Sequence, residues 1–114
     1  MTMRYLILIA SNAKTWANMP TEELARVQAE YRDYGEAIKR SGHFVAGSQL
    51  PRDKATTIRQ RNGKLEMVDG PFAETKEQLG GFYLIEVKDH DEAMAVAGRC
   101  PGAKYGCLDV RPTI

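Results

Sequence analysis

The sequence contains few cysteines and no excess of either charge. Of its 114 residues only two are cysteines, which are too few for a disulfide framework, and neither CxxC nor a Cys/His pair at metal-ligand spacing occurs. We interpret both cysteines as ordinary thiols. Sixteen basic residues against fifteen acidic ones leave a net charge of +1, with the basic residues scattered. We therefore expect neither a metal site nor direct binding to nucleic acid.

Membrane-spanning runs and phosphate-binding motifs are also absent. The opening apolar run YLILIA is too short to cross a membrane and lacks the small-residue cleavage pattern of a signal peptide. Neither GxGxxG nor GxxxxGK[ST] occurs, so no motif supports a nucleotide or flavin. We expect a cytoplasmic protein that uses no cofactor and does not contact a membrane.

The composition that remains is that of an ordinary globular protein. Hydrophobic residues make up 43% of the chain and charged residues 27%, which is far from the composition of a disordered protein. A chain of this length supports one hydrophobic core. We expect a single domain over residues 1–114.

Hydrophobic periodicity predicts a regular series of elements. The stripe of Leu24, Val27, Tyr31, Tyr34 and Ile38 has helical spacing, whereas MRYLILIA is typical of a central strand. Asp89 three residues before Glu92 predicts the capping box of a second helix, which carries Ala93, Val96, Ala97 and Cys100 on one face. We expect strands over 3–10, 43–50, 56–60, 64–68, 81–88 and 104–112, helices over 21–42 and 89–100, and a helical turn or two within 71–79.

The clearest local signal is a hairpin. Asn62-Gly63 suits a two-residue type I′ turn between TTIRQR and KLEMV. This register pairs Arg59 with Glu66 and Thr56 with Asp69, and it directs Asp69 to the same face as the apolar Leu65 and Met67. We therefore expect the Asp69 carboxylate on the inward face of a sheet, where it needs partners.

The order of the elements predicts the fold class. Without the inserted hairpin, the chain has the split strand-helix-strand pattern of a ferredoxin-like α+β sandwich. The two helices of such a fold cover one face of the sheet and leave the other face bare. Because the first and fifth strands are strongly apolar, we expect a second subunit on the bare face.

One long motif resembles a known family. The string DGPFAETKEQLGGFYLIEV, together with upstream LILI, Trp16, downstream DEAMAVAGRCP and terminal DVRP, resembles the DGPF branch of the YCII-related superfamily. The resemblance covers nearly the whole chain. It implies a ferredoxin-like fold that assembles as a dimeric α/β barrel, sometimes in larger assemblies. It also implies an enzymatic role, suggested for YCII-related proteins from a histidine and an aspartate near a cleft, and a link of some relatives to extracytoplasmic-function sigma factors.

Asp69 is the strongest candidate for chemistry. At a strand end among apolar residues, it can act as a general base or anchor a substrate. The structural alternative is an Asx turn in which backbone N–H groups of the DGPF turn satisfy the carboxylate. His43 is a second acid–base candidate at neutral pH, although its place after a helix end also suits the helix dipole.

Several other residues are candidates for substrate binding. Arg111 can clamp a carboxylate with its bidentate fork, or it can bind Asp109 or another acidic residue. Glu74 and Lys76 can line the rim of a polar pocket or a dimer interface, or they can form a solvated face. Trp16 can cover a cleft, or it can anchor its loop to the core.

Two hypotheses of function follow. The first is an acid–base enzyme that acts on a small polar molecule in a cleft at the border of a homodimer. The second is a non-enzymatic module that senses a ligand or binds a protein, with a sigma factor as one partner. The first requires Asp69 to be open to a pocket, and the second requires its segment to be buried by another chain or satisfied internally.

Overall fold

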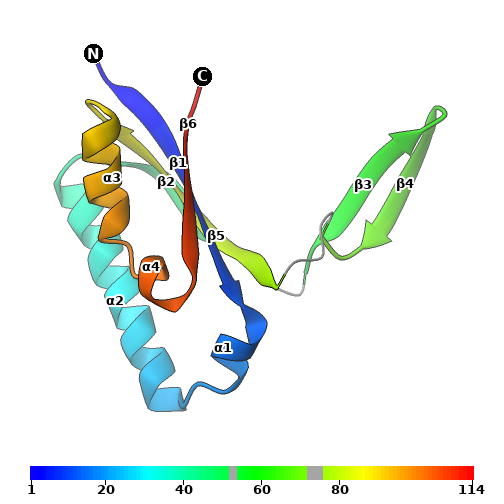
Figure 1. Cartoon of the computed structure of the whole chain (residues 1–114), viewed down its shortest axis with the longest axis horizontal. Coiled ribbons are helices and arrows are strands. Elements are labelled where there is room, and N and C mark those ends of the chain that lie inside the picture. The colour runs from blue at the N-terminus through cyan, green and yellow to red at the C-terminus, as the bar shows by residue number, and fades with distance from the viewer. Residues whose placement is uncertain (52–53, 72–75) are drawn as a thin grey trace.

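The structure of the protein is a computed structural model that describes residues 1–51, 54–71 and 76–114. Figure 1 shows a layer of helices against a twisted sheet, and a hairpin that projects from this body. Within the described residues, no helix combines the length and the apolar character that a membrane crossing requires. The elements follow the order β1 (Met3–Asn12), α1 (Ala13–Ala17), α2 (Thr21–Arg40), β2 (Phe44–Gln49), β3 (Thr56–Arg61), β4 (Lys64–Asp69), β5 (Glu77–Val87), α3 (His90–Gly98), α4 (Gly102–Tyr105) and β6 (Cys107–Pro112).

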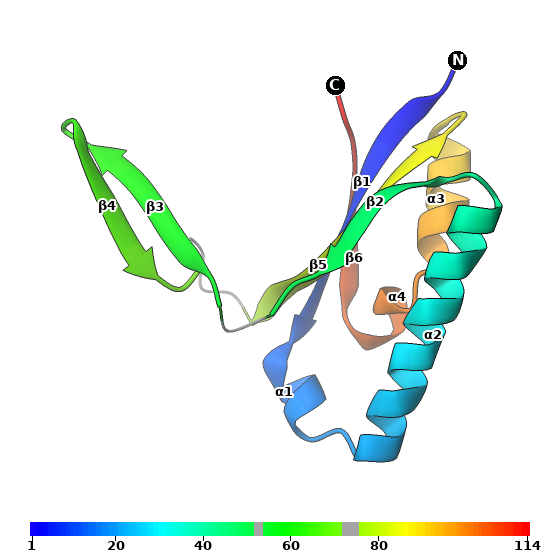
Figure 2. The same cartoon turned by 180° about the vertical axis from the view of Figure 1, so that it is seen from behind.

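The main sheet is antiparallel and has the strand order β2-β5-β1-β6. The central strand β1 lies between β5 and β6, as its apolar sequence predicts. Helices α2 and α3 lie on one face of this sheet in both views (Figures 1 and 2). The mixed α+β fold is consistent with the predicted ferredoxin-like sandwich.

The hydrophobic core lies between the helices and one face of the sheet. Tyr5, Ile7 and Ile9 of β1 are at most 7% exposed, and they pack with Tyr34 and Ile38 of α2. Helix α3 and the turn after it contribute the face that the sequence predicts. Its residues are buried in the same core: Ala93, Val96, Ala97 and Cys100. Alternation along the strands thus sends every second residue to the helices.

The opposite face of the main sheet, here called the open face, carries the alternate residues of the same strands. Leu6 of β1 pairs with Leu84 of β5, and Leu8 pairs with Phe82. These four side chains are all only half-buried, and the helices lie on the other side of the sheet (Figures 1 and 2). The sequence therefore supplies an apolar surface that α2 and α3 do not cover.

The predicted hairpin is confirmed as strands β3 and β4. Asn62 and Gly63 have φ angles of 51° and 76°, the left-handed values that a type I′ turn requires. Arg59 pairs with Glu66 and Thr56 pairs with Asp69, as the sequence predicts. However, the two strands form a separate sheet of their own, which extends from the body on the side away from α2 (Figures 1 and 2).

The segment before β5 differs from the prediction. A helical turn was expected within 71–79, whereas β5 begins at Glu77; residues 72–75 lie outside the described part of the chain. Gly80 ends no helix, because Ile9 pairs with Gly81 while Ala10 pairs with Leu79, so that Gly80 is the extra residue of a β-bulge. A glycine inside a strand is typical of such a bulge.

Candidate functional site

A cavity of about 580 Å³ lies between α2 and the β2–β5 side of the sheet. Residues of β1, α1, α2, β2 and β5 line it. The cavity exists because α2 does not pack against β2 along its whole length. Its apolar wall is formed by Ile9, Trp16, Leu24, Val27, Tyr31, Phe44 and Tyr83. Its polar and charged lining is formed by Gln28, Arg32, Glu36, Lys39, Ser48 and Gln49.

Glycines in β2 and β5 shape the floor of the cavity. A Cβ atom at Gly47 would lie 2.7 Å from Cδ1 of Tyr83, so only glycine lets the Tyr83 ring lie close to β2. A Cβ atom at Gly81 would lie 3.0 Å from the carbonyl oxygen of Ser48. The strands therefore approach closely and present backbone to the cavity where other residues would place side chains.

Trp16 anchors its segment to the body of the protein and also lies at the cavity. Its indole Nε1 donates a 2.6 Å hydrogen bond to Oγ of Ser11, which is only 2% exposed. Its ring lies 5.7 Å from that of Tyr105, so it fastens the short helix α1 to the body. The same side chain lines the cavity.

Three charged residues of α2 stand at the cavity. Arg32, Glu36 and Lys39 are exposed, and within the described chain none of them forms an ion pair. Nζ of Lys39 lies 5.0 Å from the centre of the Phe44 ring, a cation–π contact at the wall of the cavity. Two cations against one carboxylate give this rim a net positive charge.

A second hollow, of about 440 Å³, lies between α2 and the segment that follows α3. Tyr34 and Cys100 line it together with Glu30 and Lys104. Burial raises the pKa of the Cys100 thiol and that of the Tyr34 hydroxyl, so both groups are neutral at physiological pH. A neutral buried thiol has no nucleophilic thiolate, which agrees with its interpretation as an ordinary thiol.

Asp69 lies at the end of β4 and is exposed. It shares a face with Leu65 and Met67, as the register predicts, but both of these are 62% exposed and enclose nothing. The inward surroundings expected for the carboxylate are therefore missing in the single chain, because the hairpin stands apart from the main sheet. Neither of the two cavities described above includes Asp69 among its lining residues.

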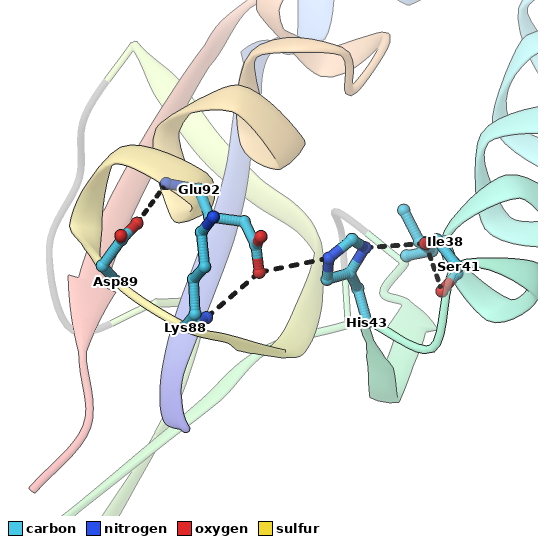
Figure 3. A network of polar contacts seen from close by, with 6 residues as sticks. All are labelled: Ile38, Ser41, His43, Lys88, Asp89 and Glu92. Atoms are coloured by element: carbon cyan, nitrogen blue, oxygen red, sulfur yellow. Dashed lines mark hydrogen bonds and ion pairs between the residues drawn. The ribbon is translucent and has the colours of Figure 1, made fainter. Parts of the chain in front are cut away.

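His43 is part of a polar network that joins α2, β2 and α3 (Figure 3). Its Nδ1 lies 2.7 Å from Oγ of Ser41, and its Nε2 lies 3.3 Å from Oε1 of Glu92. The same Oε1 accepts a hydrogen bond from the backbone N–H of Lys88, and Asp89 caps α3 by accepting one from the N–H of Glu92. One of the two hydrogen bonds of the predicted capping box is thus present, the one from the Glu92 N–H to the Asp89 side chain. In the other, the Glu92 side chain accepts from the N–H of Lys88 and not from that of Asp89. The network holds the start of α3 against the end of α2.

The remaining candidates lie apart from the cavity. Arg111 makes two hydrogen bonds to Asp109, of 2.9 and 2.8 Å, and this contact holds the pKa of the Asp109 carboxyl below its ordinary value. The pair with Asp109 is one of the arrangements that the sequence allows for Arg111. Lys76 is exposed just before β5, and Glu74 lies outside the described residues. In the part of the chain that the structure describes, no three His, Cys, Asp or Glu side chains group as metal ligands do.

Sequence reasoning did not find the cavity or its rim on α2. The available signal was the spacing of Arg32, Glu36 and Lys39, which recur at helical intervals around Gly35. A charged stripe of this kind is usually a solvated helix face. Only the position of α2 relative to β2 shows that this stripe borders a hollow.

Comparison with known proteins agrees with the motif in the sequence. The model of the YCII-related domain matches residues 3–114 of the chain. An uncharacterised protein of Rhizobium meliloti (strain 1021) is 36% identical over 116 aligned positions, which cover 96% of this chain and 91% of that protein. The chain therefore belongs to the YCII-related domain family.

Proposed function

We propose that this protein binds a small organic molecule in the cavity between α2 and the sheet. The observation that carries the proposal is the cavity itself: its volume of about 580 Å³ lies in the range of ligand sites in proteins. An apolar wall with a few polar groups at one side is the usual composition of such sites. Glycine backbone at the floor adds room for close approach of a ligand.

Binding is better supported than acid–base catalysis at this site. Among the described residues that line the cavity, Glu36 is the only carboxylate, and it is exposed on the rim. Catalysis by Asp69 stays a hypothesis that needs a second subunit, because the carboxylate is exposed in the single chain. His43 faces Ser41 and Glu92, so its ring nitrogens already have partners. We therefore favour a ligand-binding or ligand-sensing protein of the DGPF branch.

The binding proposal is tested with the single tryptophan of the chain. Trp16 lines the cavity, so its fluorescence reports on an occupant. We expect members of a panel of small aromatic acids, amines and neutral compounds to shift its emission and to raise Tm. The variant Gln28→Phe, which places a ring at the rim, is expected to abolish both responses. Ala25→Phe is the matched control, because Ala25 is exposed on the same helix and does not line the cavity.

Absence of any response across the panel would contradict the proposal. An equal response of Gln28→Phe and the wild type would do the same, because it would show that the compounds bind elsewhere.

A second function, self-association, is favoured by a different observation. The chain carries two apolar surfaces that do not meet: the open face, and the hairpin face formed by Ile58, Leu65 and Met67, which are 57–62% exposed. Exposed apolar patches of this kind mark interaction sites, and an isolated two-stranded hairpin has little stability of its own. We propose that a second copy of the chain covers both surfaces in a homodimer.

The geometry supports a second copy more than an unrelated partner such as a sigma factor. The hairpin extends from the side of the sheet that carries the open face (Figures 1 and 2). A copy seated on the open face is therefore flanked by the hairpin, and twofold symmetry makes each chain give and receive the same contacts. Both complementary surfaces belong to this one chain.

Light scattering after size exclusion tests this assembly. We expect the mass of a dimer for the wild type and that of a monomer for Leu8→Glu, which places a charge in the open face. Met67→Glu should weaken the dimer, whereas Glu66→Gln, on the opposite face of the same hairpin, should not. A monomeric wild type at micromolar concentration would refute the homodimer.

A further inference from the structure

Gly35 is a glycine that neither backbone conformation nor packing explains. It lies inside α2, which spans Thr21–Arg40, where glycine is less favourable than any residue except proline. It is not among the glycines with positive φ. A Cβ atom added to it would meet no atom within 4 Å. What the residue does is line the cavity and leave the space in front of its backbone empty.

The wall around Gly35 suits a flat apolar body. Tyr31, Phe44 and Tyr83 contribute aromatic rings to the lining, and the Phe44 and Tyr83 rings meet edge to face at 6.4 Å. The Tyr83 hydroxyl is neutral at physiological pH, and burial raises its pKa further, so the three rings themselves carry no charge. An aromatic or alicyclic ring can pack against these rings where the helix lacks a side chain.

The charged side chains on the same face of α2 indicate which charged group the ligand carries. At about 100° per residue, Arg32, Lys39 and Glu36 all project to the same side of Gly35, at about 60°, 40° and 100° from it, so the carboxylate shares this face with both cations. Within the described residues, neither cation has an acidic partner. With two cations and one carboxylate, the face that borders the empty space has a net positive charge and can pair with an anionic group.

From these observations, and resting on the proposed ligand site, we infer that the ligand is an organic anion with a flat apolar ring system. Arg32 and Lys39 bind its acidic group, and Gly35 holds the space for its ring. Glu36 opposes the anion and limits its affinity. Gly35 is thus a residue that determines specificity by size, and it does so at a cost in helix stability.

Two dyes with the same aromatic body separate the two parts of the inference. 1-Anilinonaphthalene-8-sulfonate carries a sulfonate, and N-phenyl-1-naphthylamine lacks it. We expect both to change Trp16 emission and the anionic dye to bind more tightly, with an advantage that disappears in high salt. Equal affinities of the two dyes would overturn the inference about charge and leave the binding site standing. If neither dye changes Trp16 emission, the proposed site itself fails.

Charge variants test the binding of the acidic group. Arg32→Gln and Lys39→Gln should each lower the affinity for the anionic dye by roughly two- to fivefold, the range expected for exposed charges. The affinity for the neutral dye should not change. Glu36→Gln should raise the affinity for the anionic dye. An equal effect on both dyes would show that these side chains act only through the fold and would overturn the assignment.

Size variants test the role of Gly35. Gly35→Leu should lower the affinity for both dyes by about tenfold or more, as expected when a pocket loses the volume of at least a methylene group. Gly98→Leu is the matched control, because Gly98 also has no atom within 4 Å of an added Cβ and does not line this cavity. Should Gly35→Leu not fold, Gly35→Ala serves, with a higher Tm and weaker dye binding expected. Unchanged dye affinity in a folded Gly35 variant would refute the role.

Discussion

The hydroxyl of Tyr34 donates a 2.8 Å hydrogen bond to the backbone carbonyl of Val96 and thereby joins α2 to α3. Tyr34 is 7% exposed, and burial raises its pKa, so the hydroxyl remains a donor at physiological pH. The bond fixes the distance between the two helices that cover the sheet. It crosses the core at the level where the second hollow opens.

Tyr34→Phe is therefore expected to lower the free energy of unfolding by about 1 kcal/mol, the usual value of a buried neutral hydrogen bond. The cost stays near this value because the Val96 carbonyl also accepts a hydrogen bond from the N–H of Arg99. Urea unfolding measures the difference. Tyr5→Phe is the control, because Tyr5 is equally buried and its hydroxyl bonds to no described residue. Equal losses in the two variants would contradict the assignment.

A surface cluster of Glu30, Lys104 and Tyr105 should give stability a pH dependence. Lys104, and then Tyr105, hold the pKa of the Glu30 carboxyl below its ordinary value of 4.5. Because the folded pKa is the lower one, the contribution of Glu30 is present above pH 4.5 and is lost as pH falls through the folded pKa. The same contact raises the pKa of Tyr105, whose contribution is present below its ordinary value and is lost at higher pH.

We expect Glu30→Gln to flatten the acid side of the stability curve measured by urea unfolding at a series of pH values. Glu22→Gln is the control, because Glu22 is exposed on the same helix and forms no ion pair among the described residues. If the wild type and Glu30→Gln lose stability in parallel below pH 4.5, the cluster does not contribute.

Much of the fold could be predicted from the sequence, because its signals are local. The helical stripe of α2 buries Val27, Tyr34 and Ile38, and the Asn62-Gly63 turn fixes the hairpin register. Such patterns depend on residues close together in the chain, where spacing alone determines which side chains share a face.

The features that the sequence did not predict depend on contacts with other elements of the fold. Gly80 forms a bulge only because β1 lies beside it, and α1 is a short helix held by the contact of Trp16 with Ser11. Asp69 was placed on the correct face of its hairpin, but the hairpin itself leaves the body. The cavity arises from the distance between α2 and β2, which no local pattern records.

The exposure of Asp69 leads to a prediction about stability. Its carboxylate has no hydrogen-bond partner among the described residues, so Asp69→Asn should change the free energy of unfolding of the monomer by less than about 0.5 kcal/mol, as for other surface substitutions. Urea unfolding at low protein concentration measures this value. A loss of about 1.5–3 kcal/mol would instead indicate a charged hydrogen bond and would favour the Asx-turn alternative.

Two glycines should respond to alanine in opposite directions. A Cβ atom at Gly106 would lie 2.0 Å from the carbonyl oxygen of Ala10, which is backbone of the central strand and cannot rotate away. Its φ of −166° is extended, so the cost comes from contact with β1 and not from backbone strain. Gly106→Ala should therefore push β6 away from β1 and lower the free energy of unfolding by about 3 kcal/mol, the upper part of the range for overpacking.

Gly35→Ala meets open space inside a helix and should raise the free energy of unfolding by about 1 kcal/mol, through helix propensity alone. Thermal and urea unfolding of the two variants beside the wild type measure both signs. A destabilised Gly35→Ala would mean that the space in front of Gly35 is filled in the folded protein. The reason for a glycine at this position would then be packing, and the size-selecting role of Gly35 would lose its basis.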